Sequence, residues 1–352
     1  MHQKKRRPAV KIVIWSIVIL LIIAAIALYF GYGEYRKVIQ PNITTDKDVS
    51  VYVLPNSTMD TVLAQLDSAD ALRNKKDLEW WMHKKDLNKH LTPGHYVFSN
   101  GMSNRDVVNI LLSAQQTPVR VVFHNTRTLS DLAGKFAAQL MFDSLDMLHF
   151  LDSTSLFTAY GLTKDNRMTL FIPNTYEMYW TATPQEVVER MQKEHDVFWN
   201  ADRMNKCAEI GLTPEQVYIL ASIVYSENAK HVDEAPRIAG VYMNRLQKGM
   251  RLEADPTVVY AIGDFTKNRV YLSDLDHDSP YNTYLYAGLP PGPIHMPPIS
   301  YIDAVLNYEH HEYIFLCARG DGSYNHYFAK TLAEHERNRK LYQKELNRQG
   351  IR

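Results

Sequence analysis

The sequence predicts a mixed α+β protein that follows a single apolar N-terminal helix, and three observations lead to this prediction. Residues 12–30 form an almost uninterrupted apolar run. Beyond it, short β-branched runs are interspersed with segments that begin at Ser or Thr and keep a helical spacing of apolar residues. Finally, an apolar helix over residues 214–228 is followed by loops rich in Pro, Gly, Tyr and Asn.

The apolar run over residues 12–30 predicts a transmembrane helix. Its nineteen residues, with Ser16 the only clearly polar one, span roughly 28 Å as a helix, just enough to cross a hydrocarbon core. Five basic residues precede the run: Lys4, Lys5, Arg6, Arg7 and Lys11. The positive-inside rule therefore places residues 1–11 in the cytoplasm and the chain beyond Tyr32 in the periplasm or outside the cell. We expect a single-pass protein of the cell inner (cytoplasmic) membrane.

A cleaved signal peptide is the alternative interpretation of this run. Ala25-Ile26-Ala27 offers a small-x-small cleavage site. However, no polar region separates this site from the apolar run, and the run is long for a signal peptide. These two features favour an uncleaved anchor.

The remaining composition excludes several functional classes. Lys plus Arg and Asp plus Glu each number 39, so the net charge of zero gives no reason to expect a nucleic-acid partner. The two cysteines, Cys207 and Cys317, lack metal-ligand spacing, and could pair or remain as buried thiols. The histidines form no compact ligand motif, so neither a metal nor another cofactor is expected.

The elements before residue 160 are short. Residues 31–48 are predicted to be a polar juxtamembrane linker. Residues 49–160 are predicted to form two small strand-plus-helix units, with turns at Pro93-Gly94 and Asn100-Gly101. The predicted strands cover residues 51–54, 95–98 and 119–123. The predicted helices cover residues 58–68, 75–82, 103–113 and 128–140.

Residues 161–352 are predicted to form a second, mixed α+β domain. A long amphipathic helix is expected over residues 184–204, and another helix from about residue 232 to 246, with Gly249 as its C-terminal cap. Strands are expected over residues 313–318 and 327–328. A charged helix over residues 331–349 closes the chain.

Glu227 is the first candidate for a functional residue. Its helix opens with a complete start signal, because Thr213 can act as N-cap, Pro214 fits the first turn and Gln216 completes a capping box. Residues 217–224 are apolar on nearly every face, so Glu227 ends a buried helix. The negative end of the helix dipole and an apolar environment both raise the pKa of a carboxyl group. A protonated carboxylic acid can serve as a general acid. The structural alternative is an exposed or Arg-paired glutamate.

The loops after this helix predict a cleft. Prolines make residues 288–294 unsuited to helix or central strand, and such rigid loops often form the wall of a binding site. Tyr and Asn side chains over residues 281–284 suit a sugar ligand. Taken singly, Asp255-Pro256-Thr257 is explained as a helix cap and residues 281–284 as a turn, but their accumulation after Glu227 favours a cleft.

Five motifs in this region resemble those of the YceG-like (MltG) family of bacterial endolytic murein transglycosylases. They are Leu220-Ala-Ser-Ile-Val-x-x-Glu227, Asn244-Arg-Leu, Met250-Arg-Leu-x-x-Asp-Pro-Thr-Val258, Tyr281-Asn-Thr-Tyr284 and Gly288-Leu-Pro-Pro-Gly-x-Ile294. The resemblance implies that Glu227 is the catalytic residue and that residues 49–160 are LysM-like. It departs at Tyr225, where many members have a second acid. The residues expected to bind the sugars are Arg251, Asp255, Thr257, Tyr281, Asn282, Thr283 and Tyr284.

The resemblance implies a lytic transglycosylase that acts on peptidoglycan. Such an enzyme cleaves the MurNAc–GlcNAc β-1,4 bond within glycan strands, leaves 1,6-anhydro-MurNAc ends and limits the length of nascent glycan. One glutamate is sufficient for this reaction, because the C6 hydroxyl of the sugar is the nucleophile. The resemblance also implies peptidoglycan synthases as partners.

Two alternatives remain open. A peptidoglycan hydrolase would use Glu227 as acid and Asp255 or Glu253 as the second carboxylate. A non-catalytic scaffold would bind glycan through the LysM-like units, with a structural glutamate at position 227. Glu209, Glu215 and Glu234 are expected to be neutral positions against which Glu227 can be compared.

Overall fold

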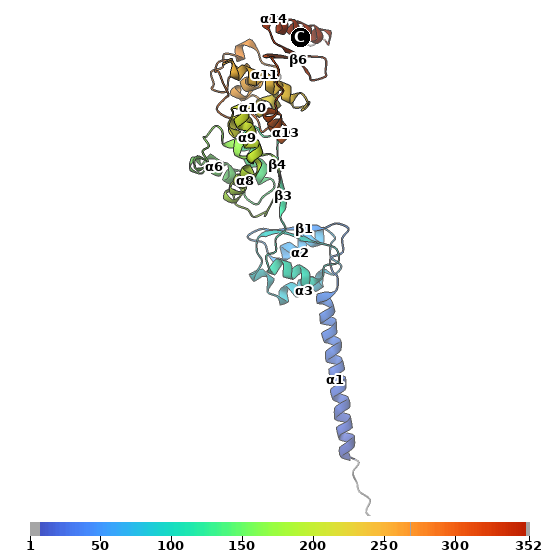
Figure 1. The fold of residues 1–352 in the computed structure, drawn as a ribbon. Coiled ribbons are helices and arrows are strands. Elements are labelled where there is room, and N and C mark those ends of the chain that lie inside the picture. Colours follow the sequence, from blue (N-terminus) through green and yellow to red (C-terminus); the bar gives the residue numbers. More distant parts are fainter. Residues whose placement is uncertain (1–7, 268, 350–352) are drawn as a thin grey trace, which may run out of the picture. The chain divides into compact units, whose positions relative to one another are not determined.

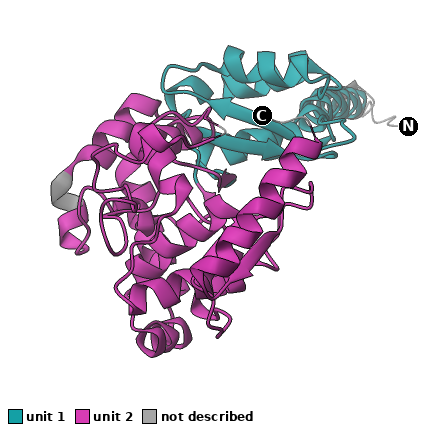
Figure 2. Ribbon diagram, turned by 90° about the horizontal axis from the view of Figure 1, so that it is seen from above, with its two compact units in different colours: residues 1–119, 179–181 teal, residues 120–178, 182–352 magenta. Residues whose placement is uncertain are grey.

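The structure is a computed structural model, and it describes residues 8–267 and 269–349. The chain divides into two compact units (Figure 2). Unit 1 comprises Met1–Val119 and Tyr179–Thr181, and unit 2 comprises Arg120–Met178 and Ala182–Arg352. This division lies well before the boundary after residue 160 that the sequence suggested.

Aromatic packing explains why residues 120–160 belong to unit 2. Helix α5 (Leu129–Ala137) packs against α6 (Ser144–Asp152). Phe136 on α5 lies 6.1 Å from Phe171 between ring centroids, and Phe123 lies 5.5 Å from Tyr176. The second predicted strand-plus-helix unit therefore shares its core with residues after 160 and does not form a separate module.

The N-terminal helix α1 spans Pro8–Ile39 (Figure 1). Within Lys11–Ile39 an 18-residue stretch has a mean hydropathy of 3.0, so the helix is long and apolar enough to cross a membrane, by length and composition only. The helix covers the predicted span and continues to Ile39, so residues 31–39 of the predicted linker are helical in the structure. Residues such as Glu34, Arg36 and Lys37 favour helix, and the first proline of this stretch is Pro41.

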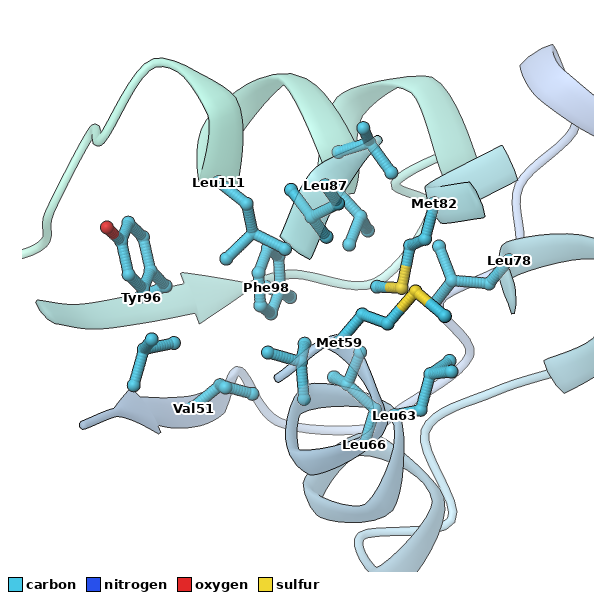
Figure 3. Close-up of a cluster of buried hydrophobic side chains, with 14 of the residues drawn as sticks. Val51, Met59, Leu63, Leu66, Leu78, Met82, Leu87, Tyr96, Phe98 and Leu111 are labelled. Atoms are coloured by element: carbon cyan, nitrogen blue, oxygen red, sulfur yellow. The ribbon is translucent and has the colours of Figure 1, made fainter. Parts of the chain in front are cut away.

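Unit 1 is built on an antiparallel pair of strands. Strand β1 (Val49–Val53) pairs with β2 (Gly94–Phe98), with Val51 opposite Tyr96. The helices of this unit are α2 (Met59–Ser68), α3 (Lys75–Lys84), η1 (Leu87–Lys89) and α4 (Asn104–Leu112). Figure 3 shows the fully buried side chains between them, including Val51, Leu66, Leu78, Phe98 and Leu111. These elements confirm the strands and helices predicted up to residue 113.

Unit 2 begins with a second strand pair. Strand β3 (Val119–Phe123) neighbours β4 (Asn174–Met178). Between these strands lie α5 and α6 together with α7 (Thr154–Ala159) and η2 (Arg167–Leu170). Neither α6 nor α7 was predicted from the sequence.

The predicted helix over residues 184–204 is two helices in the structure. Helix α8 (Pro184–Phe198) ends before Trp199, and α9 (Ala201–Ile210) begins after Asn200. The side-chain oxygen of Asn200 accepts a hydrogen bond of 3.1 Å from the backbone N–H of Arg203. A residue of this type favours an N-cap over a helix interior, which explains the break.

The buried helix predicted before Glu227 is confirmed as α10 (Pro214–Glu227). It packs against α11 (Ala235–Gln247), α12 (Asp255–Ile262) and α13 (Ile299–Leu306). Thr213 and Gln216 form the predicted capping box. Because α10 is surrounded by other helices, its C-terminal residue is held in the interior of unit 2.

The C-terminal elements of unit 2 form a hairpin and a helix. Strand β5 (Phe315–Ala318) pairs antiparallel with β6 (His326–Ala329), with Cys317 opposite Tyr327. Helix α14 (Leu332–Arg348) begins after its N-cap Thr331 and packs against this hairpin. Short connections, η3 (Leu272–Asp274) among them, complete the unit. Cys207 is buried, Cys317 is partly buried, and both are free thiols.

Candidate active site

Glu227 lies at the last position of α10 with its side chain half-buried. Burial raises the pKa of this carboxyl group to about 6, against the opposing effects of a hydrogen bond from Tyr242 and the nearby His326. The carboxylate of Asp255 adds to the rise in pKa. Burial, which the sequence predicted together with the helix dipole, is therefore the main reason why Glu227 can hold a proton near neutral pH.

Tyr242 is the closest described partner of this carboxyl group. Its hydroxyl donates a hydrogen bond of 2.5 Å to Glu227 Oε1. Tyr242 is 2% exposed, and burial together with the carboxylate raises the pKa of its phenol well above the usual value. The phenol therefore stays a donor at neutral pH and fixes one oxygen of Glu227. Sequence reasoning missed this residue, because nothing in the pattern of α11 distinguishes it from an ordinary core tyrosine.

Asp255 brings a second carboxylate to the same site. It is the first residue of α12, and its Oδ1 accepts a hydrogen bond of 2.6 Å from the hydroxyl of Tyr284. Burial and the neighbouring carboxylate raise the pKa of Tyr284 far above its usual range. Asp255 thus begins a helix, as the structural alternative proposed, and also faces the site of Glu227.

Both acids line a cavity of about 850 Å³ in unit 2, which falls within the range of ligand sites. Arg127, Lys267, Arg269 and Arg339 add positive charge to its wall. The other lining residues are Ser226, Pro256, Val259, Tyr260, Phe265, Val270, Ile294, Tyr342, Gln343 and Leu346. The combination of aromatic rings, cations and two acids suits a polar, partly anionic ligand such as a substituted sugar chain.

The loop over residues 288–294 contributes Ile294 to this wall, as the cleft prediction expected. The backbone N–H of Ile294 donates a hydrogen bond of 3.1 Å to Ser222 Oγ on α10. A Cβ atom at Gly292 would collide with the carbonyl oxygen of Asp165, so only glycine fits this close approach. The loop is neither helix nor strand and is tied directly to the helix that carries Glu227.

Three of the predicted sugar-binding residues are buried supports. Thr257 and Thr283 are joined by a hydrogen bond of 2.8 Å between their hydroxyl oxygens, and both are at most 1% exposed. Asn282 is fully buried, and its amide donates to the carbonyl oxygens of Leu275 and His277. These contacts join α12 to the loop around residue 283 and thereby hold Asp255 in place.

The two remaining predicted residues also make contacts within the protein. The guanidinium of Arg251 donates a hydrogen bond of 2.9 Å to the carbonyl oxygen of Tyr284. Tyr281 packs on Tyr260 with 4.8 Å between ring centroids. Among the residues that the structure describes, only Glu227 and Asp255 of the predicted site belong to the cavity wall.

Glu234, which the sequence suggested as a neutral position, is part of a buried network beside the site. Its Oε2 lies 2.7 Å from His326 Nδ1 and accepts a hydrogen bond of 2.9 Å from the amide of Asn228. Its Oε1 accepts from the backbone N–H of His326. The carbonyl oxygen of Asn228 accepts a hydrogen bond of 2.6 Å from Tyr301. The network joins the end of α10 to the β5–β6 hairpin, so substitution of Glu234 is expected to have structural consequences.

Known proteins are similar to this chain in sequence and in fold. The profile of the YceG-like family matches residues 51–341. A Bacillus subtilis protein named endolytic murein transglycosylase is 25% identical over 332 residues, which cover 90% of each chain. A Streptococcus pneumoniae protein of the same name is 24% identical over 94% of this chain, which spans 65% of its length.

A solved structure of a YceG-like protein is also similar to this chain. A crystal structure of a YceG-like protein from Listeria monocytogenes has a TM-score of 0.55 and 28% sequence identity. The match covers 83% of this chain and 99% of that chain. Because the family profile extends over most of the sequence, the chain belongs to the YceG-like family.

Proposed function

We propose that this protein is a membrane-anchored, endolytic lytic transglycosylase of peptidoglycan. The observation that carries the proposal is Glu227: a half-buried carboxyl group whose pKa is raised to about 6, at the wall of a cavity of about 850 Å³. Membership of the YceG-like family and the names of the Bacillus and Streptococcus relatives support a murein substrate. The bond cleaved is the MurNAc–GlcNAc β-1,4 bond within a strand.

In the proposed reaction Glu227 acts first as acid and then as base. It donates its proton to the glycosidic oxygen while the bond from C1 of MurNAc to that oxygen breaks. The C6 hydroxyl of the same MurNAc then forms a new bond to C1 and returns a proton to Glu227. The products are a 1,6-anhydro-MurNAc end and a free GlcNAc hydroxyl, and no water is consumed.

The neighbouring residues prepare Glu227 for both steps. Tyr242 donates to Oε1 and so orients the carboxyl group, which leaves Oε2 to exchange the proton with the sugar. Asp255 helps to keep the pKa of Glu227 high. We assign the other predicted sugar-binding residues to holding α12 and its adjoining loops, with Tyr284 acting through its hydrogen bond to Asp255.

We further propose that α1 anchors the protein in the cytoplasmic membrane, with residues 1–11 in the cytoplasm, and with the part of unit 1 that follows α1 and all of unit 2 outside. The length and hydropathy of α1 support this proposal. In that arrangement the enzyme would meet glycan strands as peptidoglycan synthases produce them and would limit their length. Residues 49–119, the part of the predicted LysM-like region 49–160 that lies in unit 1, would contribute affinity for glycan.

A hydrolase is the second candidate, because Asp255 lines the same cavity as Glu227. With Asp255 as the second carboxylate, water would replace the C6 hydroxyl as the nucleophile. The product would then carry a reducing end in place of an anhydro end. Glu253 is a weaker candidate for this role, because its carboxylate pairs with Arg245 at 2.9 Å.

Mass spectrometry of glycan fragments tests the proposal. Purified full-length protein in detergent is incubated with uncrosslinked peptidoglycan strands, and the new ends are identified. We expect anhydro ends, each lighter by one water than a reducing end. Reducing ends would establish the hydrolase instead. If neither product forms and a Glu227→Gln protein retains the cellular effect, the protein is a glycan-binding scaffold.

A further inference from the structure

Aromatic and cationic side chains meet where α1 joins unit 1, at the end of the unit that carries α3 (Figure 1). The Nζ atoms of Lys84 and Lys37 lie 4.6 Å and 5.4 Å from the ring centroid of Trp80. The Nζ atom of Lys85 lies 4.9 Å from the ring centroid of Trp81. We call these five residues the juxtamembrane surface.

The helix α1 determines the height of this surface above a membrane. If residues 12–30 fill the hydrocarbon core, Glu34 lies about 6 Å beyond it and Lys37 about 10 Å beyond it, at a rise of 1.5 Å per residue. The headgroup layer on each side of the core is roughly 5–8 Å thick. Lys84 Nζ lies 3.6 Å from Glu34 Oε2. On that premise the Lys84 end of α3 is level with the lipid headgroups, and the backbone of Lys37 lies just beyond them.

The connection between α1 and unit 1 is continuous. Helix α1 runs without interruption from Pro8 to Ile39 and packs against both α3 and α4. The side-chain amide of Asn104 on α4 donates a hydrogen bond of 2.8 Å to the carbonyl oxygen of Lys37. Unit 1 is thus fastened to the helix that would span the membrane, and its α3 end cannot move away from the headgroups without breaking these contacts.

The chemistry of the juxtamembrane surface fits an anionic lipid surface. Tryptophan is enriched at the headgroup level, and lysine is attracted to anionic headgroups. The side chains of Lys84 and Lys37 are 55% and 43% exposed, and Lys85 is also exposed. Glu34 is the acid that pairs with Lys37 and Lys84. The adjacent Asp86 is paired with Lys89 at 2.7 Å, so the three lysines of the juxtamembrane surface against Glu34 leave an excess of positive charge.

We propose that the juxtamembrane surface rests on anionic phospholipid headgroups at the outer face of the membrane that α1 spans. Lys84 and Lys85 contact lipid phosphates, Trp80 lies among the headgroups, and unit 1 is held against the membrane. This inference rests on the proposed membrane anchor. It adds a lipid-binding role to unit 1 that is separate from any glycan-binding role.

Fluorescence quenching on the full-length protein tests this inference. The protein, with Cys207→Ser and Cys317→Ser, is reconstituted in vesicles of phosphatidylglycerol or of phosphatidylcholine. A fluorophore is attached to His83→Cys on α3, which is exposed beside Lys84. Leu54→Cys, which is 53% exposed after β1, is the matched label position away from α3. We expect headgroup-linked nitroxide lipids to quench the label at position 83 far more than the label at position 54.

The charge on the surface is tested in the same vesicles. Lys84→Gln/Lys85→Gln should lower the affinity of this surface for phosphatidylglycerol headgroups by on the order of fivefold per lysine, which is measured as weaker quenching of the label at position 83. The matched variant Lys164→Gln/Lys193→Gln, which removes two exposed lysines of unit 2, should leave the quenching at position 83 unchanged.

Two results would overturn the inference without affecting the anchor. In the first result, alkaline carbonate does not extract the protein from the vesicles, yet the label at position 83 is not quenched. The other is equal quenching in both lipids with no effect of the lysine substitutions. If carbonate extracts the protein from the vesicles, the anchor itself is wrong, and with it the lipid contact.

Discussion

The two glutamates that flank the turn between α10 and α11 are treated in opposite ways by the fold. At Glu227, burial outweighs the single hydrogen bond from Tyr242, and the pKa rises to about 6. At Glu234, burial also favours the neutral form, but hydrogen bonds from the side chain and backbone of His326 and from Asn228 outweigh it and lower the pKa. Glu227 is the last residue of α10 and Glu234 is the N-cap residue of α11, both in unit 2.

The difference shows what separates a candidate acid from a structural carboxylate. A carboxylate that accepts several N–H hydrogen bonds stays ionised and joins elements together, as Glu234 joins α11 to the hairpin. A carboxyl group with one neutral hydroxyl donor and few other described polar contacts can keep a proton. Burial raises the pKa of both carboxyl groups, and the number of hydrogen-bond donors around each then decides which role it has.

The largest expected effect is on activity at Glu227. Glu227→Gln keeps the shape of the side chain but cannot release a proton, so strand cleavage should fall by roughly 10²–10⁴-fold. The measurement is the rate at which anhydro ends form, with the melting temperature recorded in parallel. Glu209→Gln and Glu215→Gln, on α9 and in the first turn of α10, are the controls and should stay within a few fold of the wild-type rate.

An inactive Glu227→Gln protein with a clearly lowered melting temperature would contradict this prediction. In that case Glu227 would stabilise the fold, as Glu234 does, and the comparison between the two residues would fail. The catalytic acid would then have to be sought at Asp255 first.

Glu234→Gln should act on stability. The amide group of glutamine would face His326 and Asn228 with a donor where the carboxylate oxygen accepts. Loss of these buried hydrogen bonds should cost roughly 1–3 kcal/mol of unfolding free energy, measured by chemical denaturation. Well below its melting temperature the variant should cleave strands much faster than Glu227→Gln. An unchanged unfolding free energy would show that the network does not hold the hairpin.

The pH dependence of stability should have opposite signs at the two residues. The pKa of Glu227 is raised in the folded state from 4.5 to about 6. Folding therefore favours the protonated form of Glu227. The contribution of this group to the stability of the fold is complete below about pH 4.5 and is lost as the pH rises through 6. Glutamine does not titrate and so does not lose this contribution. Between pH 4.5 and 7.5 the unfolding free energy of Glu227→Gln should therefore rise by up to about 2 kcal/mol relative to that of the wild type.

At Glu234 the pKa is lowered, so the stabilisation by the carboxylate is present above its ordinary pKa and is lost as the pH falls through the folded value. The cost of Glu234→Gln should therefore shrink in acid. Denaturation of the three proteins at a series of pH values checks both slopes. Parallel curves for all three would remove the electrostatic distinction between the two sites.

The smallest effect is expected for Tyr242→Phe. The hydrogen bond from Tyr242 lowers the pKa of Glu227, so its removal should raise that pKa. Because the acid must be protonated, the alkaline limb of the pH–rate profile should move to higher pH, by less than about one unit. The rate on the plateau should fall a few fold as the carboxyl group loses its orientation. Tyr218→Phe is the matched control, because it removes a buried hydroxyl that donates to the carbonyl oxygen of Phe171. It should leave the pH of the alkaline limb unchanged.

Local patterns predicted most of the helices and strands. Thr213, Pro214 and Gln216 identified the start of α10 because a capping box is formed within four consecutive residues. The strands of unit 1 followed from β-branched runs between turn residues. The break at Trp199 was missed, because an Asn in an otherwise periodic segment is compatible with both a helix interior and an N-cap.

The boundary between the units could not be read from such patterns. Helix α5 has the same amphipathic pattern whether it packs on a preceding or a following segment. Its assignment to unit 2 depends on contacts of Phe136 and Phe123 with Phe171 and Tyr176, which come later in the sequence. The choice of packing partner is a property of the whole chain.

By itself, the sequence determined that a buried helix ends in a glutamate, that rigid loops follow it, and that an apolar segment lies near the N-terminus. Capping, apolar periodicity and proline act over a few residues, so they can be read directly. Only the tertiary structure showed which partners set the pKa of each glutamate. The contacts of Tyr242 with Glu227 and of His326 with Glu234 join different elements, and a pKa depends on the charges and donors that surround a group in space.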